Sequence, residues 1–381
     1  MRPTLPDKQQ GDTMTTATST SAFTTPAPYW QGGVDDTLQC VSVHDETHDV
    51  RTFTFRAVPA RRFAYLPGQF ITLELSIDGQ TVNRCYTLSS SPTRPDTVSI
   101  TVKRVPGGQV SNWLHDNLQP GMNISVLGPS GEFSFAHAPA ERYLFLSAGS
   151  GITPLMSMSR ALGDLGGSID VAFVHSARTP ADLIFRHELV QLSRARHGFR
   201  QAAIVQSRHP EPEWTGLEGR LDLAGLERLV PDFREREVFC CGPAPYMTGA
   251  RELLQSAGFD MTHYHEESFN FADLNAGSTA EAAVEEAAPA CEGETGFEVR
   301  FAKLGDIVQT KPGQTILAAA QQQGLRVPSS CSKGLCGTCK TKMLEGKVDM
   351  KHGGGIRQRE IDQGWILPCC SVPLTPVVLD R

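Results

Sequence analysis

The chain has 381 residues, 40% of them hydrophobic and 20% charged, with a formal net charge of −7. That length predicts about two to three domains, and the acidic balance argues against nucleic acid or an anionic membrane as the main partner. No run of apolar residues approaches the ~18 needed to span a membrane, so we expect no membrane segment.

The first 33 residues form a distinct stretch rich in Thr, Ser and Pro. It lacks the apolar core of a secretory signal, and its low hydrophobicity predicts a disordered tail. Translation starts at either Met1 or Met14. Without an export signal we expect a cytoplasmic protein whose ten cysteines stay reduced. Clustered cysteines in that compartment indicate metal or redox chemistry rather than disulfides.

Residues 34–138 are predicted to form short β-strands. TFTFRAV, QFITLEL and TVSITVKRV alternate in polarity, and Gly, Pro, Asn and Asp separate them, which predicts a small antiparallel β-barrel. RCYTLSS, residues 84–90, lies near the end of this region. GGQVSNWLHDNL, residues 107–118, places two glycines and a serine at a helix start, which presents free N–H groups and a positive dipole to a phosphate. Taken alone, the first is an ordinary strand and the second a capped surface helix.

Residues 139–271 have a different pattern. Apolar strands such as RYLFLSAGSG, SIDVAFVHSA, FRQAAIVQS and REVFCCG alternate with helical segments, which predicts an α/β domain with a doubly wound parallel sheet. AGSGITP follows the first strand and ends in Pro154, where the usual dinucleotide fingerprint ends in glycine. CCGPAPYM, residues 240–247, and YHEESF, residues 264–269, come later. Alone, these three would be a tight turn, two buried thiols and one more core phenylalanine.

Two further segments complete the predicted multidomain chain. Residues 272–295 are rich in Ala and Glu without a strand pattern, which predicts a linker. Residues 296–381 form a third unit, with strands at each end, one helix in TILAAAQQQG and a cysteine-rich loop after it.

The cysteines of this third unit have the spacing of a metal site. Cys331, Cys336 and Cys339 follow C-x4-C-x2-C, and WILPCCSVP supplies two more. A [2Fe–2S] cluster needs four thiolates, and this spacing with a distant fourth cysteine is its plant-type signature. Cys369 fits the fourth position, and Cys370 would fit if the register shifted by one. Zinc is the alternative, but zinc knuckles usually pair two C-x2-C units.

The order of these motifs resembles the ferredoxin–NADP reductase superfamily followed by a plant-type ferredoxin of β-grasp fold. RCYTLSS is similar to the superfamily's R-x-Y-[ST] motif, AGSGITP to its G-x-G-x-x-P turn and CCGPAPYM to its C-G-P-x-x-M segment. The resemblance implies FAD-binding, NAD(P)H-binding and [2Fe–2S] domains, and it favours FAD over FMN because the phosphate segment is present. The cofactor-binding residues that it implies are Arg84, Tyr86, Thr87, Leu88 and Ser89; Gly108, Gln109, Val110 and Ser111; Gly149, Gly151, Thr153 and Pro154; and Cys241, Gly242, Pro243 and Phe269.

The resemblance also implies individual roles. Arg84 pairs with a flavin phosphate, Tyr86 lies against the isoalloxazine ring, and Thr87 binds the polar edge of that ring near N5. Cys241 lies where nicotinamide meets flavin, and Phe269 covers the flavin face. The expected catalytic residues are Tyr86, Thr87, Cys241 and Phe269, with Glu267 and Ser268 near N5.

The implied function is an electron-transfer reductase, in which NAD(P)H reduces FAD and single electrons pass through the cluster to a terminal oxygenase. HSARTPADLIF, FDMTHYHEESF and GWILPCCSVP are similar to reductase subunits of glycine betaine demethylases and related Rieske-type quaternary-amine oxygenases. NADH is favoured on that resemblance, although Arg178 and the pair Ser207–Arg208 would suit the 2′-phosphate of NADPH. The alternatives are a reductase for a hybrid-cluster protein or a ring-hydroxylating dioxygenase, or a non-catalytic redox sensor.

Overall fold

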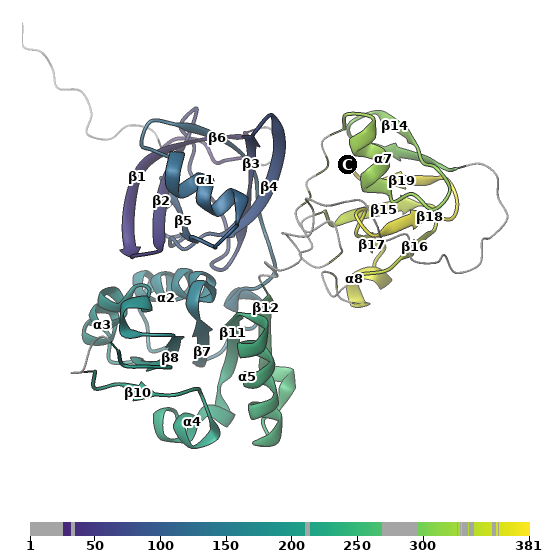
Figure 1. Cartoon of the computed structure of the whole chain (residues 1–381). Coiled ribbons are helices and arrows are strands. Elements are labelled where there is room, and N and C mark those ends of the chain that lie inside the picture. The colour runs from purple at the N-terminus through teal and green to yellow at the C-terminus, as the bar shows by residue number, and fades with distance from the viewer. Residues whose placement is uncertain are drawn as a thin grey trace, which may run out of the picture.

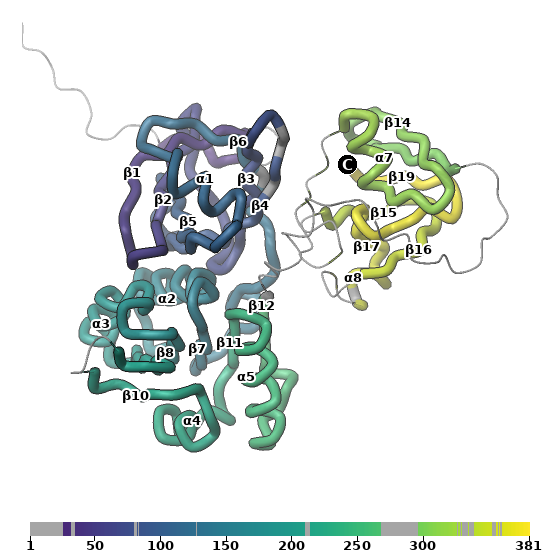
Figure 2. The backbone as a smooth tube through the Cα atoms, in the orientation of Figure 1, coloured from purple at the N-terminus to yellow at the C-terminus, as the bar shows by residue number. Residues whose placement is uncertain are grey.

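The chain builds three sheet-containing units, whose helices and strands are labelled in Figure 1 and whose backbone path is traced in Figure 2. The structure, a computed structural model, describes residues 26–31, 35–209, 214–268, 296–325, 327, 329, 334, 339–352, 356 and 358–381. The predicted linker and most of the predicted tail lie outside these residues, as do Phe269, Cys331 and Cys336.

The first unit is an antiparallel sheet in the order β4-β3-β6-β1-β2-β5. A bridge between Leu88 and Ile100 joins the end of β4 to β5, so the two outer strands meet and the sheet closes as a barrel. Phe53, Phe55 and Leu73 fill its interior. Its elements are β1 (Thr37–Thr47), β2 (Val50–Ala57), β3 (Phe70–Ile77), β4 (Gln80–Thr87), β5 (Val98–Lys103), α1 (Gln109–Asn117) and β6 (Asn123–Ser130).

The second unit is a parallel sheet in the order β10-β9-β8-β7-β11-β12. The chain enters at β7, moves outward to β10 and then crosses back to β11, so the strand order reverses between β7 and β11. Ligands of such sheets bind outside the carboxyl ends of the strands at this reversal. Its elements are β7 (Arg142–Ala148), α2 (Ile152–Leu165), β8 (Asp170–Ala177), α3 (Arg186–Ala195), β9 (Phe199–Val205), β10 (Leu217–Glu218), α4 (Leu223–Leu229), β11 (Glu237–Gly242), α5 (Ala244–Ser256) and β12 (Tyr264–Ser268).

Both faces of this parallel sheet are buried by helices. Phe145 and Phe173 pack with Met156 of α2 in one core, whereas Leu146, the strand neighbour of Phe145, packs with Leu254 of α5 in the other. Because successive side chains of a strand point to opposite faces, strands with two buried faces are apolar throughout. The doubly wound fold predicted from these apolar runs is confirmed.

Helix α2 connects the second unit to the barrel. Ser157 Oγ donates a hydrogen bond to the carbonyl of Ser90 (2.7 Å), and Arg160 Nη1 donates to the carbonyl of Ser89 (2.6 Å). Near the end of the helix, Asp164 accepts a hydrogen bond from Arg94 Nη2 (2.6 Å). The helix that begins beside the AGSGITP turn therefore also holds the backbone at the end of the RCYTLSS motif.

The third unit is a five-stranded mixed sheet in the order β14-β13-β19-β15-β17 with one helix against it, as the predicted β-grasp fold requires. Ile316 and Leu317 of that helix, α7, join Val299 and Phe301 of the sheet in one core. Its elements are β13 (Glu298–Phe301), β14 (Asp306–Gln309), α7 (Ile316–Gln322), β15 (Thr341–Glu345), β16 (Val348–Met350), α8 (Gln358–Asp362), β17 (Trp365–Ile366), β18 (Ser371–Pro373) and β19 (Val377–Leu379).

Short 3-10 turns lie between the helices and strands of the first two units. The 3-10 turns are η1 (Phe135–His137), η2 (Gly149–Gly151), η3 (Pro180–Asp182), η4 (Phe233–Glu235) and η5 (Met261–His263). In the part of the chain that the structure describes, no helix is long and apolar enough to cross a membrane.

Candidate active site and metal centre

The RCYTLSS motif lies at the end of β4, where the barrel meets α2. Burial raises the pKa of Tyr86 and lowers that of Arg84. The Thr87 hydroxyl is enclosed and has no hydrogen-bond partner among the described residues. Leu88 points into the barrel core, and the Ser89 hydroxyl bonds to a hydroxyl on β5 at 2.9 Å. The Thr87 hydroxyl is therefore able to form a hydrogen bond with a ligand.

The predicted phosphate turn forms the start of helix α1. Gly108 is the N-cap, and no side chain caps the helix, so its first N–H groups remain available to an anion. Ser111 Oγ accepts from the backbone N–H of Val105 (3.1 Å) and donates to the carbonyl of Gly108 (3.3 Å), so this hydroxyl organises the turn. Gln109 is exposed and Val110 belongs to the barrel core.

The two predicted nucleotide turns lie against each other at the carboxyl end of the parallel sheet. Cys241 on β11 pairs in register with Ser147 on β7, and Ala148 alone separates Ser147 from the turn Gly149–Gly151. A Cβ placed on Gly151 would lie 2.3 Å from the carbonyl oxygen of Cys241, and one on Gly242 would lie 3.1 Å from the Cβ of Ala148. Glycine at these positions is therefore what lets the two backbones approach so closely.

Thr153, Pro154 and Pro243, which are also predicted to bind the nucleotide, lie at the starts of helices. Thr153 and Pro154 lie in the first turn of α2, and Thr153 Oγ1 donates to the carbonyl of Ser150 (3.2 Å). Pro243 directly precedes α5. Cys241 is fully buried, and burial raises the pKa of its thiol well above the usual range, so it stays protonated.

Strand β12 brings a carboxyl group to the same edge of the sheet. Glu267 pairs in register with Cys241, and its Oε2 atom is enclosed without a hydrogen-bond partner among the described residues. Burial, with a smaller contribution from the neighbouring Cys85 thiol of β4, raises the pKa of Glu267 to about 8. The carboxyl group is therefore mostly protonated at neutral pH, and it lies near both the barrel motif and the second nucleotide turn.

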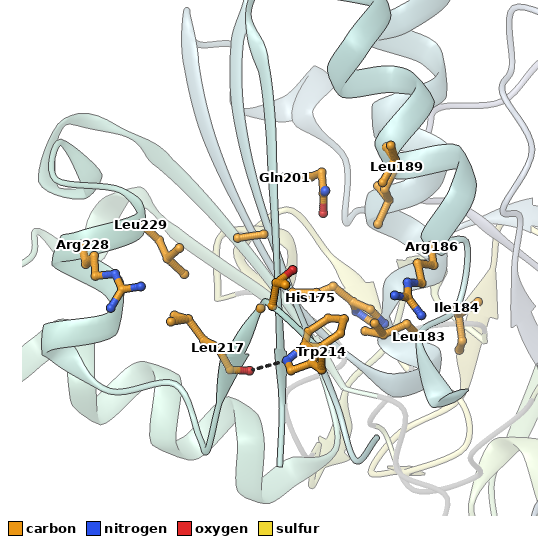
Figure 3. Close-up of a pocket in the computed structure, with 15 residues that line it drawn as sticks. His175, Leu183, Ile184, Arg186, Leu189, Gln201, Trp214, Leu217, Arg228 and Leu229 are labelled. Carbon is orange, nitrogen blue, oxygen red and sulfur yellow. Dashed lines mark hydrogen bonds between the residues drawn. The ribbon is translucent and has the colours of Figure 1, made fainter. Parts of the chain in front are cut away.

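A cavity of about 400 Å³ lies elsewhere in the second unit, with His175 of β8 in its wall (Figure 3). His175 Nδ1 is 2.7 Å from Ser147 Oγ, and its Nε2 atom has no partner among the described residues. Burial lowers the pKa of His175 to about 3, so the ring is neutral. None of the residues predicted for the site lines this cavity. A histidine inside an apolar strand was its only signal in the sequence.

Two of the predicted cluster ligands meet in the third unit. The Sγ atoms of Cys339 and Cys369 are 3.2 Å apart, both side chains are buried, and neither forms a disulfide. Cys370 Sγ lies 3.6 Å from the carbonyl of Leu367 and also lies close to Gly334 of the loop, 2.6 Å from where a Cβ of that residue would stand. Cys369 is 30 positions from Cys339 in the sequence, yet its buried thiol lies beside that of Cys339. An iron–sulfur cluster needs such a distant cysteine as its fourth sulfur ligand.

Three protein-family models match consecutive parts of the chain. An oxidoreductase FAD-binding domain matches residues 37–135, an oxidoreductase NAD-binding domain residues 145–252, and a 2Fe-2S iron-sulfur cluster binding domain residues 302–374. The glycine betaine monooxygenase reductase subunit of Pseudomonas aeruginosa is 47% identical over 346 residues, 90% of this chain and 94% of the relative. The chain belongs to the family of flavin- and iron–sulfur-containing oxygenase reductases. The predicted family, FAD and the [2Fe–2S] cluster are thus confirmed.

Other members of this reductase family are similar over nearly the whole chain. The stachydrine N-demethylase reductase subunit of Rhizobium meliloti is 41% identical, covering 90% of this chain and 96% of the relative. Among solved structures, an intact type IV self-sufficient cytochrome P450 monooxygenase is 25% identical with a TM-score of 0.65, over 91% of this chain and 41% of that protein. Phthalate dioxygenase reductase shares the fold at 24% identity and a TM-score of 0.55, over 91% and 97%.

Proposed function

We propose that this reductase carries electrons from NADH through FAD and the [2Fe–2S] cluster to an oxygenase that demethylates a quaternary amine. The 47% identity with the glycine betaine monooxygenase reductase subunit carries the proposal, and the 41% identity with the stachydrine N-demethylase reductase subunit supports it. The substrates of both relatives bear an N-methylated quaternary nitrogen beside a carboxylate. We infer that the partner oxygenase of this chain acts on the same class of molecule.

The chain's own residues supply binding and positioning. When bound, FAD accepts two electrons together and releases them singly, which matches a two-electron donor to a one-electron cluster. Thr87 offers an enclosed hydroxyl with no protein partner described, which suits a hydrogen bond to the polar edge of the ring. Arg84 and Tyr86 of the same strand would hold a phosphate and the ring face. The uncapped start of α1 would hold the pyrophosphate.

The nucleotide turns would place the nicotinamide at the reversal of strand order. Gly149 adopts a positive φ of 54° in the turn, Gly151 allows the close backbone approach, and the neutral Cys241 thiol adds no charge there. Glu267, mostly protonated at neutral pH, would likewise leave that edge uncharged and able to donate a hydrogen bond. Leu88, Ser89 and the remaining predicted residues stay proposals of the same kind, as does Phe269, which lies outside the described residues.

For the cluster we propose the ligands Cys331, Cys336, Cys339 and Cys369. The convergence of the Cys339 and Cys369 sulfur atoms supports the distant fourth ligand. We also propose the domain boundaries 34–138, 139–271 and 296–381, with 272–295 as the linker. Each family-model match falls inside one of these ranges.

The function is tested with the full-length protein loaded with FAD and the cluster. NADH should bleach the flavin and cluster absorbance. The reduced protein should support formaldehyde release from glycine betaine or stachydrine by the oxygenase that works with the respective relative. Cluster reduction that drives a ring-hydroxylating dioxygenase, but neither quaternary-amine oxygenase, would show that the proposed partner is wrong. Absence of any reduction by NADH would contradict the whole electron path.

The ligand assignment is tested by a pair of matched substitutions. Cys339→Ser should remove or destabilise the cluster while flavin reduction by NADH continues, because flavin and nucleotide bind in the other two domains. Cys370→Ser is the control and should keep the [2Fe–2S] absorbance. Loss of the cluster in Cys370→Ser with retention in Cys369→Ser would shift the ligand register by one residue.

A further inference from the structure

The carboxyl ends of β8 and β9 lie side by side and continue to pair beyond the strands. Ala177 pairs in register with Val205, and the backbone N–H of Ser207 donates to the carbonyl of Arg178 (3.0 Å). Arg178 and Arg208 therefore leave the sheet next to each other. They lie at the same end of the sheet as the turn Gly149–Gly151, where a dinucleotide's adenosine ribose is bound in folds of this kind.

Arg178 is already engaged by carboxylates. Its Nη2 atom lies 2.8 Å from Asp182 Oδ1 and 3.7 Å from Asp49 Oδ2. Asp182 is buried and also accepts hydrogen bonds from the backbone N–H (3.1 Å) and hydroxyl (2.8 Å) of Thr179. Asp49 lies 2.9 Å from Lys103 Nζ. Arg178 is held in a network whose positive and negative charges balance.

Arg208 is held by a different carboxylate. Its Nε atom donates to Glu218 Oε2 at 2.6 Å. Glu218 is the second residue of β10 and pairs in register with Val205, so the strand pairing brings its carboxylate beside the end of β9. The two side chains are 55% and 39% exposed, so a soluble nucleotide can reach them.

This pairing bears on how the two nicotinamide nucleotides are distinguished. NADPH differs from NADH by a 2′-phosphate, whose negative charge needs an unpaired cation, whereas the 2′-hydroxyl of NADH can donate to a carboxylate. We propose that Glu218 is a specificity-determining residue, which neutralises Arg208 and thereby selects NADH over NADPH. The inference rests on the proposed nicotinamide oxidation and names the chain's own residue for its preference.

The test removes the carboxylate charge and keeps the shape. In Glu218→Gln holoprotein, affinity for 2′,5′-ADP should rise about three- to fivefold, the upper scale of one exposed charge, while affinity for 5′-AMP changes less than about twofold. The ratio of kcat/KM for NADPH to that for NADH, with ferricyanide as acceptor, should rise by a similar factor. The gain should shrink at about 0.5 M salt, where exposed charges are screened.

Two further variants separate this role from a general effect. Glu227→Gln removes another exposed carboxylate of the same domain, which pairs with Arg234 at 3.4 Å. It should change neither the affinity for 2′,5′-ADP nor the ratio of kcat/KM for NADPH to that for NADH. Arg208→Ala combined with Glu218→Gln should abolish the gain, because no released cation remains.

Three results would count against one proposal or the other. An unchanged 2′,5′-ADP affinity in Glu218→Gln, or a wild type that already prefers NADPH, overturns the role of Glu218. If neither nucleotide reduces the flavin, the proposed function fails instead, and the two binding affinities still decide the role of Glu218.

Discussion

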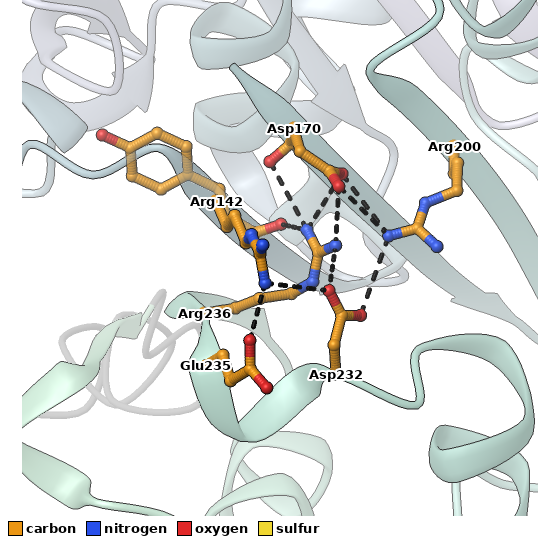
Figure 4. Close-up of polar contacts among 7 residues, drawn as sticks. Arg142, Asp170, Arg200, Asp232, Glu235 and Arg236 are labelled. Carbon is orange, nitrogen blue, oxygen red and sulfur yellow. Dashed lines mark hydrogen bonds and ion pairs between the residues drawn. The ribbon is translucent and has the colours of Figure 1, made fainter. Parts of the chain in front are cut away.

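The two ends of the parallel sheet in the nucleotide domain differ in the charge of their buried polar groups. At the amino end, the first residues of the strands form an ion network around Arg236 (Figure 4). Arg236 is fully buried, and its two Nη atoms donate to both carboxylate oxygens of Asp170 (3.1 and 2.9 Å), to Asp232 (2.7 Å) and to the carbonyl of Tyr143 (3.0 Å). Burial opposes ionisation of Asp170, but hydrogen bonds from Arg236 outweigh it and lower the pKa of this carboxyl.

Both ends contain enclosed atoms without a hydrogen-bond partner among the described residues, Arg236 Nε and Asp232 Oδ1 at the amino end and Glu267 Oε2 and His175 Nε2 at the carboxyl end. The ends differ in charge, because burial leaves Glu267 and His175 uncharged near neutral pH. Buried groups whose pKa is shifted toward the neutral form are common at functional sites. The contrast indicates that the amino end serves stability, whereas the carboxyl end is built to receive cofactor and nucleotide.

The largest effect that this contrast predicts is at Gly151 on the carboxyl end. In Gly151→Ala, the new Cβ would lie 2.3 Å from the Cys241 carbonyl oxygen and 2.5 Å from the Gly242 nitrogen, which are backbone atoms that cannot rotate away. The two turns must separate by about 1 Å, a misplacement that can lower a rate about 100-fold. We expect that loss in flavin reduction by NADH, measured by stopped-flow absorbance.

Gly163→Ala on the same helix is the matched control. A Cβ there meets only the flexible Leu192 Cδ2 atom at 3.4 Å, and alanine favours a helix interior over glycine by about 0.5–1 kcal/mol. Its flavin reduction should match the wild type. Equal rates for Gly151→Ala and Gly163→Ala would show that the close approach of the two turns does not position the nucleotide.

The next largest effect is expected at the amino end, on stability alone. Arg236→Ala leaves Asp170 and Asp232 without their buried partner, and breaking such a pair costs about 3 kcal/mol when the carboxylates keep some contact with water. The midpoint of thermal unfolding of the nucleotide domain should fall by about 5–10 °C. NADH-dependent flavin reduction at low temperature should remain near the wild-type rate.

Arg200→Ala provides the comparison for this second prediction. Arg200 is 49% exposed and lies 3.4 Å from Asp170, so its removal should cost less than about 1 kcal/mol. A stability loss as large as that of Arg236→Ala would show that burial does not distinguish the two arginines. A rate loss in Arg236→Ala at low temperature would show that the amino end is not purely structural.

The sequence predicted the carboxyl end far better than the amino end. The turns at Gly149–Gly151 and at Gly242 are short and local, and each follows an apolar strand whose pattern is visible in a few residues. Arg236 and Asp170 are 66 positions apart and belong to no motif, so only the parallel strand order brings them together. In the sequence, Arg236 and Asp170 each resemble an ordinary charged residue at the start of a strand.

The metal centre shows a different limit. Spacing within one loop predicted the cluster and its fold, which the family comparison confirms. The choice between Cys369 and Cys370 depends on a single step of register in a distant turn, which spacing alone does not fix. The 3.2 Å distance between the Sγ atoms of Cys369 and Cys339 favours Cys369.

The smallest expected effect concerns Glu267 and its dependence on pH. A free glutamate has a pKa near 4.5, whereas burial raises the pKa of Glu267 to about 8. Between these values the unfolded chain has released its proton and the folded protein retains it, so the unfolded state binds fewer protons. The free energy of unfolding therefore falls as pH rises through this window. Glu267→Gln keeps a neutral group at every pH and should lack this decrease.

The variant should thus gain stability over the wild type as pH rises from about 5 to 8, and the gap should level off above that. We expect the gap to grow by at least about 1 kcal/mol over this window, because each unit of pKa shift corresponds to about 1.4 kcal/mol. Thermal unfolding at a series of pH values measures it, and Glu266→Gln, which alters the exposed neighbour on β12, is the control. A growing gap that also appears in Glu266→Gln would mean that the pH dependence does not come from Glu267. A gap that is constant with pH would mean that Glu267 is ionised in the folded protein. The carboxyl end of the sheet would then carry a negative charge, as the amino end does at Asp170.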